Sequence, residues 1–437
     1  MIAFFMMFVG LVRSPVLSAF ATHDSYRGGG SNPDASLEHF AFIGSSVLGA
    51  GQQGSIRGRE LSRREARAGA YTMALECKLR KPRNMRGDFF VDESCVDCDV
   101  CRWMDPRTFT RSGLGSIVSS QPNTEEERMS TFKAMLACPT GSIRTMRPDK
   151  KVTEALASFP LAVDEERLPN VYQLAPTTKA SLGNTAYLIV RPDKGNIMID
   201  VPRFLKKTAA KVEALGGVKY LIVTARNNGI GHEPWKAKFP GMIRILHRFD
   251  LQRKTRIMEE RLDGSGPWFL VAEGKESAEA GYVTGDTARF DFVRVPQDKR
   301  APKDPSVKIV GLPGQTRGSV GVVFETETKD GVTERAAFTG GTVGFSTYMK
   351  ARYMIPRKTI DRLDTFPRTV ETERQLLASS VRRLAEEGVT SLLPGRGART
   401  FYDSPEEATA RLRDAADDAD AIPDYLRNPM VVPAEAR

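Results

Sequence analysis

Three cysteines stand close together in the segment ESCVDCDVCRW, and a fourth lies further along the chain. Cys95, Cys98 and Cys101 have the spacing C-x2-C-x2-C, and Cys138 is followed directly by Pro139. Three thiolates on one tight loop can ligate three corners of an iron–sulfur cubane, while a distant Cys-Pro supplies the fourth and turns the chain away. The four cysteines are therefore predicted to hold one [4Fe-4S] cluster.

Two other interpretations of these cysteines stay open, a zinc site and structural cysteines. Structural zinc sites use paired C-x2-C motifs, and a third cysteine three residues further on fits that pattern poorly. Disulfide bonds have no sensible pairing within C-x2-C-x2-C and would leave one thiol over. The fifth cysteine, Cys77, lies outside the motif and is expected to be a free or buried thiol.

The segment GDFFVDESCVDCDVC, together with the later CPTGSI, resembles the single-cluster [4Fe-4S] ferredoxins. The resemblance covers residues 85–145. No second set of ligands lies between Cys101 and Cys138, so one cluster is expected. The resemblance implies electron transfer with a redox partner protein that the sequence does not identify.

The interval before the fourth cysteine is predicted to form an amphipathic helix packed over the cluster. Thr124 and Glu127 fit a capping box, in which each residue bonds to the backbone of the other. Met129, Phe132 and Leu136 recur at helical spacing. These apolar residues are therefore expected to belong to the core rather than to a binding surface.

Charged residues next to the cysteines bear on the charge of the cluster. Asp97 and Asp99 would add negative charge to a cluster that four thiolates already make negative, whereas Arg102 would oppose it. The sequence leaves the sign of the net effect open.

From about residue 165 the chain alternates short apolar strands with helices, which predicts a layered domain with sheets between helices. One helix is expected to end at Gly216, and another to present Leu377, Val381 and Leu384 on one face and end at Gly388. The expected strands are 185–190, 195–200, 219–224, 243–247, 306–312, 319–327 and 335–341.

The order SLGNTAYLIV, GNIMIDVPR, KYLIVT, GHEPW, LPGQTRGS, AFTGG and LLPGRG resembles the metallo-β-lactamase fold. It is particularly similar to proteins in which a small ferredoxin precedes that fold. The resemblance covers roughly residues 165–400. It implies an α/β protein, an αββα four-layer sandwich preceded by a small α+β ferredoxin-like domain.

In that family, histidines and aspartates at strand ends hold one or two metal ions. Most of the matching positions here ligate metals poorly, since Ala and Gly carry no donor and Asn and Gln offer neutral amide oxygens. Only one expected histidine is retained, and an arginine would place a permanent cation in the site. The former metal positions implied by the resemblance are Ala225, Asn227, Asn228, Gly231, His232, Gln315, Gly341 and Arg396.

We therefore expect an iron–sulfur electron-transfer or redox-sensing protein whose second domain has no catalytic residue and holds neither zinc nor a di-iron site. Arg226, Arg317 and Arg396 would bias its cleft toward an anionic ligand or a docking partner. A filled structural remnant is the alternative for the cleft. For the whole chain, the alternative is a metal-dependent hydrolase or oxidoreductase with divergent ligands, coupled to the cluster. A purely structural iron–sulfur site is a third possibility.

With 437 residues, 41% of them hydrophobic, the chain can form two or three folded domains. Its net charge of +10 is spread along the chain, and no nucleic-acid motif accompanies it, so no nucleic-acid partner is expected. The expected organisation is a ferredoxin-like domain at 76–150, a lactamase-like domain at 165–403 and a C-terminal helix and tail at 404–437.

The N-terminus is expected to direct the chain to a compartment. Residues 1–19 have the shape of a cleavable signal peptide, and residues 20–75 form a Gly-, Ser-, Ala- and Arg-rich tract, expected to be a mostly disordered transit peptide or linker. Together they resemble the two-part presequence of plastid proteins in algae with complex plastids. We expect the plastid stroma, with the secretory pathway as the alternative, and no membrane span in the mature protein.

Overall fold

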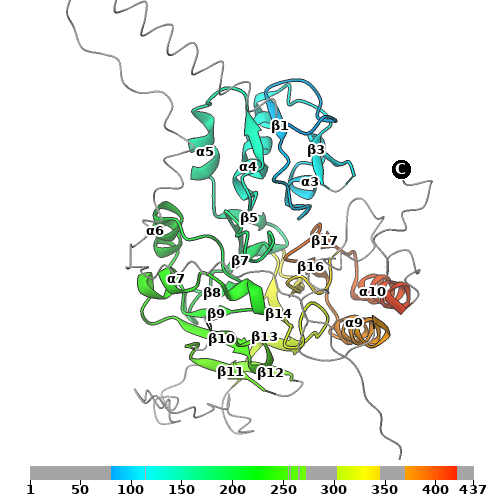
Figure 1. Ribbon diagram of the computed structural model, residues 1–437. Helices are drawn as coiled ribbons and strands as arrows, with labels where there is room; N and C mark the ends of the chain where they lie inside the picture. The colour runs from blue at the N-terminus through cyan, green and yellow to red at the C-terminus, as the bar shows by residue number, and fades with distance from the viewer. Residues whose placement is uncertain are drawn as a thin grey trace, which may run out of the picture. The chain divides into compact units, whose positions relative to one another are not determined.

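Two β-sheets stacked face to face form the centre of the larger part of the described chain (Figure 1). The computed structural model describes residues 80–113, 115–253, 255, 257–263, 266–271, 303–344 and 370–420. All of them belong to one compact unit, residues 43–437. The expected signal peptide, the transit peptide, Cys77 and the end of the C-terminal tail lie outside the described residues.

The first part of the described chain, residues 80–157, carries the four cysteines and is called the cysteine domain below. It holds two small antiparallel sheets, β1 with β4 and β2 with β3, and three helices. Phe89, Phe109 and Phe132 lie in its core. The elements are β1 Phe89–Val91, α3 Val100–Met104, β2 Phe109–Arg111, β3 Ser116–Val118, α4 Glu125–Ala137, β4 Ile143–Thr145 and α5 Lys151–Ala157.

The predicted helix before the fourth cysteine is α4, and its capping box is confirmed. The Thr124 hydroxyl accepts from the Glu127 N–H at 3.2 Å, and the Glu127 carboxylate accepts from the Thr124 N–H at 3.3 Å. Of the three apolar residues expected in the core, Phe132 is fully buried, whereas Met129 and Leu136 are only partly buried. Small residues complete the buried face, which is why the apolar stripe is weak: Thr131, Ala134 and Ala137.

Residues 161–420, called the sandwich domain below, begin with a seven-stranded sheet of order β11-β10-β9-β8-β7-β6-β5. Strands β8 to β11 run parallel to one another, and β5 to β8 pair antiparallel. Its first strand starts at Leu161, before the expected boundary at residue 165, because β5 forms a hairpin with β6. The strands are β5 Leu161–Asp164, β6 Leu168–Leu174, β7 Ala186–Ile189, β8 Ile197–Ile199, β9 Tyr220–Ile222, β10 Ile243–His247 and β11 Glu260–Leu262.

The second sheet of the sandwich domain has six strands in the order β12-β13-β14-β15-β16-β17. All its pairs are antiparallel except β15 with β16, which run parallel. The strands are β12 Trp268–Val271, β13 Lys303–Gly311, β14 Val320–Glu327, β15 Thr333–Phe338, β16 Ser391–Leu393 and β17 Thr400–Phe401.

Successive side chains of a strand point to opposite faces of its sheet. Both faces of each sheet carry apolar side chains, so each face must be covered, one by the other sheet and one by helices. Tyr187 and Ile199 of the first sheet pack with Val322 and Phe338 of the second in one inner core. Rings of Tyr187 and Phe338 meet edge to face, with centroids 5.2 Å apart.

The outer faces of both sheets are covered by helices (Figure 1). On the first sheet, Leu188 and Leu221 pack with residues of α6 and α7. On the second, Val323 and Leu392 pack with residues of α9 and α10. The expected αββα four-layer sandwich is therefore confirmed. The helices are α6 Lys206–Ala214, η1 Arg226–Gly229, α7 Glu233–Lys238, η2 Arg248–Asp250, α9 Val370–Ala385 and α10 Pro405–Asp420.

The two C-terminal helices close the sandwich against the second sheet. Leu377, Val381 and Leu384 of α9 are all buried, as the helical spacing predicts. In α10, Leu412 is buried against the same core. Gly388 takes a φ of +62° just after α9, a left-handed conformation that ends the helix at little steric cost.

The cysteine and sandwich domains share a small apolar core and several polar contacts. Val100 and Ala137 pack with Phe159 and Ala175. The Thr177 hydroxyl donates to the carbonyl of Ala137 at 2.6 Å. Two further contacts join the domains: the Arg203 guanidinium donates to the Pro139 carbonyl at 2.8 Å, and Arg399 lies 5.0 Å from the Trp103 ring centre.

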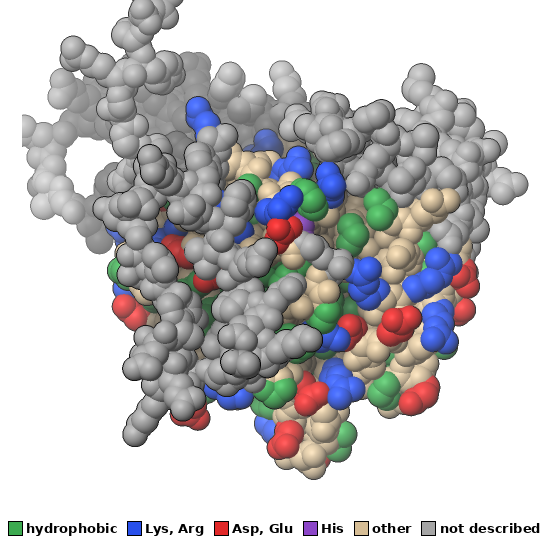
Figure 2. Space-filling model, turned by 90° about the horizontal axis from the view of Figure 1, so that it is seen from below, with side chains coloured by type: hydrophobic (Ala, Val, Ile, Leu, Met, Phe, Trp, Pro, Cys, Tyr) green, Lys and Arg blue, Asp and Glu red, His purple; other side chains and the backbone are tan. Residues whose placement is uncertain are grey.

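On the face shown in Figure 2, the described Lys and Arg side chains are interspersed with Asp and Glu. Such mixing is typical of a solvated surface. None of the helices in the described part of the chain combines the length and apolar character that a membrane crossing needs.

One partly buried carboxyl group makes the stability of the sandwich depend on pH. Glu260 of the edge strand β11 lies opposite Ile245. Burial raises the pKa of Glu260 to about 7, and the neighbouring Glu259 adds to the shift. A carboxyl whose pKa is raised on folding stabilises the protein in its neutral form, and that stability falls as pH rises from the unfolded pKa through the folded one.

We expect Glu260→Gln to be more stable than wild type at pH 8 by about 1–2 kcal/mol, after allowance for solvent screening of a partly exposed group. The gap should narrow toward pH 5, because the side chain of Glu260 is then mostly neutral in the folded protein. Urea unfolding across pH 5–8 measures this, with the exposed Glu126→Gln as control. Parallel stability curves for wild type and Glu260→Gln would contradict the expectation.

Candidate metal centre

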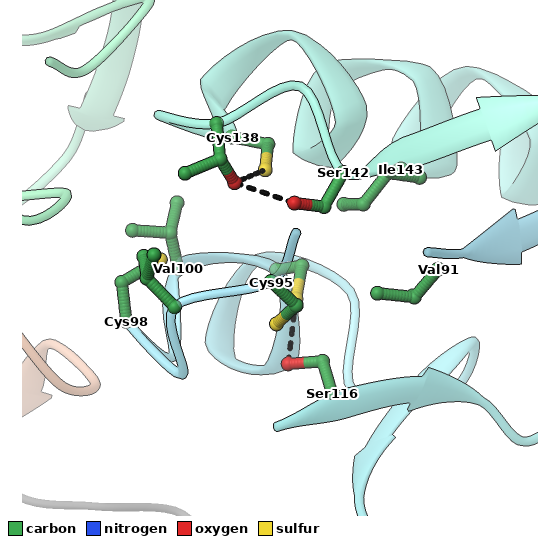
Figure 3. A pocket seen from close by; sticks show the side chains of 11 residues that line it. Val91, Cys95, Cys98, Val100, Ser116, Cys138, Ser142 and Ile143 are labelled. Atoms are coloured by element: carbon green, nitrogen blue, oxygen red, sulfur yellow. Dashed lines mark hydrogen bonds between the residues drawn. The ribbon is translucent and has the colours of Figure 1, made fainter. Parts of the chain in front are cut away.

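The four cysteines predicted as ligands surround one pocket in the cysteine domain (Figure 3). None of the four forms a disulfide bond. Cys101 is buried, and the other three are partly buried. The remaining lining is mostly apolar or hydroxylic: Val91, Val96, Val100, Ser116, Thr140, Ser142 and Ile143.

Local backbone geometry brings the cysteines to this pocket. Between Cys95 and Cys101, Asp97 and Asp99 take left-handed φ values of 54° and 71°, which curl the loop. Aspartate tolerates this conformation better than most residues. Cys101 lies in the first turn of α3, and Cys138 ends α4. Short-range spacing therefore places three thiols, and the length of α4 places the fourth.

The thiols are held by hydroxyl groups as well as by backbone. The Cys101 thiol donates to the Ser116 hydroxyl at 3.2 Å, and Ser116 in turn accepts from Arg102 at 2.8 Å. Cys138 contacts the Thr140 hydroxyl at 3.5 Å (Figure 3). Hydrogen bonds around cluster sulfurs are one of the means by which proteins tune a cluster.

Burial makes these thiols weak acids in the absence of a metal. Burial raises the pKa of Cys98 well above its usual range, and the nearby Cys138 and Cys101 add to it. The pKa of Cys101 is raised to about 12, mainly by burial, against the opposing effect of Arg102. Metal binding at such a site releases protons, because the ligand is the thiolate.

The acidic residues beside the cysteines are neutralised by arginines. Arg102, which is buried, forms ion pairs with Asp97 at 2.8 Å and with Asp99. Arg111 pairs with Asp97 at 2.8 Å. The two carboxylates thus face two guanidinium groups, which answers the question that the sequence left open: this loop adds little net charge to the site.

The donor set fits a [4Fe-4S] cluster. Four free thiols of one domain line a single pocket, and no competing carboxylate or imidazole lines it. Among the described residues, no three His, Cys, Asp or Glu side chains converge on a point where one metal ion could sit; the four thiols surround a space instead. A cluster bound there would supply one-electron chemistry.

At the strand ends of the sandwich domain, a different set of residues forms a closed polar network around Asp200. This fully buried carboxylate accepts from the Thr224 N–H and hydroxyl, both at 2.7 Å, and from the side-chain amides of Asn228 at 3.1 Å and Asn184. Asn228 also donates to the Thr224 hydroxyl at 2.9 Å. Burial raises the pKa of Asp200 to about 6, and the hydrogen bonds oppose the shift.

Glycines allow the neighbouring turns to close on this network. Gly395 donates to the carbonyl of Gly340 at 2.6 Å. A β-carbon on Gly340 would lie 2.2 Å from the Thr224 hydroxyl oxygen, and one on Gly395 would lie 2.0 Å from the Asn184 side-chain oxygen. The two turns therefore pack directly against the side chains of Thr224 and Asn184.

The eight former metal positions are only partly brought together. Asn228 lies in the Asp200 network. Gln315 accepts from the Gly341 N–H at 3.0 Å, and Ala225 is buried at the start of η1. Asn227 accepts a backbone hydrogen bond from Ile230, and Gly231 takes a φ of +93°.

The side chain of His232, the retained histidine, makes its hydrogen bond outside the Asp200 network. It is fully buried at the start of α7, and its Nδ1 lies 2.9 Å from the Arg244 guanidinium of β10. This agrees with the interpretation of His232 as a histidine hydrogen-bonded to its surroundings.

The three arginines expected in one cleft divide into two places. Arg226 donates to the carbonyl of Phe249 at 3.3 Å, and Arg317 lies over the Phe249 ring at 3.8 Å. Arg396 is buried and donates to the carbonyl of Ser181 at 2.7 Å. The anionic ligand expected at this cleft stays a prediction.

Sequence reasoning missed two buried carboxylates and one glycine of the site. Asp200 closes the segment GNIMID with a left-handed φ of 60°, and Asp250 accepts from the Arg226 N–H at 2.9 Å. Gly183, also left-handed, packs against Cys98. Asp200 directly follows the apolar run Ile197–Ile199, whereas no comparable pattern marks Asp250 or Gly183.

Comparison with known families supports the assignment of the first domain. Residues 91–145 match the family model described as the 4Fe-4S single cluster domain of Ferredoxin I. The chain therefore carries an iron–sulfur domain of the single-cluster type. No curated protein matches the chain.

Solved structures similar to this chain are metallo-β-lactamases and their relatives. One from Legionella gormanii has 14% identity, 59% of this chain and 94% of that chain covered, and a TM-score of 0.36. An archaeal superfamily protein from Sulfolobus tokodaii has 14% identity, coverage of 56% and 85%, and a TM-score of 0.30. One from Staphylococcus aureus has 12% identity, coverage of 61% and 68%, and a TM-score of 0.36. These likenesses are distant, and the four layers rest on the packing described above.

Two glycines with the same backbone strain test whether the cysteine pocket needs the sandwich domain. Gly183 has a φ of +83°, and a β-carbon there would lie 2.7 Å from the Cys98 Cβ and 2.9 Å from its Sγ. Gly231 has a φ of +93° and no atom within 4 Å of a β-carbon.

Gly183→Ala should lower the iron bound per chain by roughly fivefold or more, since a clash of 1 kcal/mol or above is directed at a ligand. Gly231→Ala carries a similar left-handed penalty and should keep its iron. Iron assay of both anaerobically purified variants decides the matter. Equal iron in the two would show that Gly183 does not shape the pocket.

Proposed function

We propose that this protein is a [4Fe-4S] electron-transfer or redox-sensing protein whose sandwich domain performs no catalysis. The observation that carries the proposal is the arrangement of Cys95, Cys98, Cys101 and Cys138 around one pocket whose described lining contains no carboxylate or imidazole. A cubane bound by four thiolates takes up and releases single electrons without needing a substrate site.

The burial of the pocket fits this role. Its lining is largely apolar, and α4 ends at one of its walls. An apolar lining excludes water from the cluster and limits its hydrolysis or oxidation. One-electron exchange across a few ångströms of protein needs only a partner that docks close to the cysteine domain.

For the sandwich domain, the contacts around Asp200 favour a structural role. A hydrolase of this fold needs an open metal position with several anionic or imidazole ligands. Here Thr224, Asn184 and Asn228 hydrogen-bond to the carboxylate, and His232 is engaged with Arg244. We propose that the domain serves for docking and for support of the cluster.

The redox partner is proposed to be a protein, and the expected plastid stroma is proposed as the location. The stroma is a reducing compartment, in which free thiols persist and clusters are assembled more readily than in the secretory pathway. The four cysteines of the pocket are free thiols, in agreement with such a compartment.

Metal analysis of anaerobically purified protein tests the proposal. We expect about four irons per chain, a broad visible absorption that dithionite bleaches reversibly, and no second metal in stoichiometric amount. Cys98→Ser should lose most of the iron, whereas His232→Gln should lose none.

Three results would contradict the proposal, each in a different way. A colourless, iron-free protein would remove the cluster. A stoichiometric zinc or second iron lost in His232→Gln, with hydrolysis of an ester or lactam, would support the metal-dependent hydrolase instead. A cluster that dithionite cannot reduce reversibly would point to a structural iron–sulfur site.

A further inference from the structure

The sandwich domain places one of its turns directly on a cysteine of the pocket. Gly183 packs so closely on Cys98 that a β-carbon on it would lie 2.9 Å from the sulfur. Two residues earlier in the same turn, the carbonyl of Ser181 accepts a 2.7 Å hydrogen bond from Arg396. The turn thus connects Arg396 of the sandwich domain with the edge of the pocket.

Arg396 is an unusual cation. Its side chain is 5% exposed, and within the described residues its Nε makes no hydrogen bond. Burial lowers the pKa of Arg396 to about 10, and the electrostatic interaction with Cys98 opposes that shift. The guanidinium therefore stays charged at neutral pH, and a negative charge on the Cys98 sulfur, as ligation would create, favours that charge.

A second arginine of the sandwich domain lies beside the fourth cysteine, Cys138. Arg203 is partly buried and donates to the carbonyl of Pro139 at 2.8 Å. Burial lowers the pKa of Arg203, and Cys138 opposes the shift. Of these two arginines, Arg396 is electrostatically coupled to Cys98 and Arg203 to Cys138.

Within the cysteine domain, the two aspartates beside the cysteines are paired with arginines. Asp97 and Asp99 are matched by Arg102 and Arg111. Arg396 and Arg203 are not part of that balance, so they add positive charge to the surroundings of the pocket. Reduction gives the cluster one more negative charge, and a buried cation nearby favours the reduced state.

We propose that Arg396, assisted by Arg203, raises the reduction potential of the cluster, so that the sandwich domain acts as an electrostatic regulator of the cysteine domain. The inference rests on the proposed cluster and deepens its function. By linkage, an arginine that stabilises the reduced cluster is itself held more tightly by it, so reduction strengthens the contact between the domains.

The test is a redox titration of the full chain, followed by electron paramagnetic resonance, with dithionite as the one-electron donor. Arg396→Gln should make reduction about tenfold less favourable, which is about 59 mV for one electron. Arg396→Lys keeps the charge and should restore most of the potential. Arg203→Gln should shift it in the same direction by less, because Arg203 is the more exposed of the two.

Arg399→Gln is the matched control. Arg399 lies three residues from Arg396 and also crosses to the cysteine domain, where it stacks on Trp103. Its loss removes one positive charge and one interdomain contact, but not a charge that interacts with a cysteine of the pocket. The potential of Arg399→Gln should equal that of wild type.

Full iron content with an unchanged potential in Arg396→Gln would overturn the inference while leaving the proposed function intact. So would an equal shift in Arg399→Gln, which would mark a general loss of charge or contact. If Arg396→Gln binds no iron, Arg203→Gln decides, and an unchanged potential there overturns the inference. Iron-free wild type would instead refute the proposed function itself.

A second readout follows from the linkage. Anaerobic wild type should unfold at a higher temperature when reduced than when oxidised, and this difference should shrink in Arg396→Gln. An unaltered difference in that variant would contradict the proposed coupling.

Discussion

The confinement of four thiols in one buried pocket is the constraint on which the rest of the structure depends. On ligation the four thiols become thiolates, which concentrate negative charge in a poorly solvated pocket. Burying this charge costs free energy unless cations compensate it. The iron supplies most of the compensation, and the surrounding chain supplies the remainder. Arg102 and Arg111 neutralise the two aspartates of the loop, and the sandwich domain contributes Arg396 and Arg203.

This view gives the second domain a purpose that does not require catalysis. The resemblance to metallo-β-lactamases implies that position 396 lies in a turn that supplies a metal ligand in that family. The arginine there is directed instead to Ser181, beside the turn that packs on Cys98. We propose that this arginine acts on the cysteine pocket rather than on a site of its own domain.

At the strand ends of the sandwich domain, neighbouring groups hold a buried carboxylate by hydrogen bonds. Asp200 receives hydrogen bonds from Thr224, Asn184 and Asn228. A buried carboxylate needs such donors, because unpaired it would cost several kcal/mol. Neutral amides, a hydroxyl and a backbone N–H supply these hydrogen bonds, and glycines let the neighbouring turns close over the carboxylate.

By itself, the sequence determined those features that depend on the spacing of residues along the chain. The C-x2-C-x2-C loop, the capping box of Thr124 and Glu127, and strands such as Ile243–His247 are each fixed by neighbours a few residues apart. Fold class followed from the order of these elements. The tertiary structure alone decided which distant groups meet: Asp200 with Asn228, His232 with Arg244, and Arg396 with the turn on Cys98. Such pairings depend on how the sheets stack and on where long side chains turn, and local spacing carries no information about either.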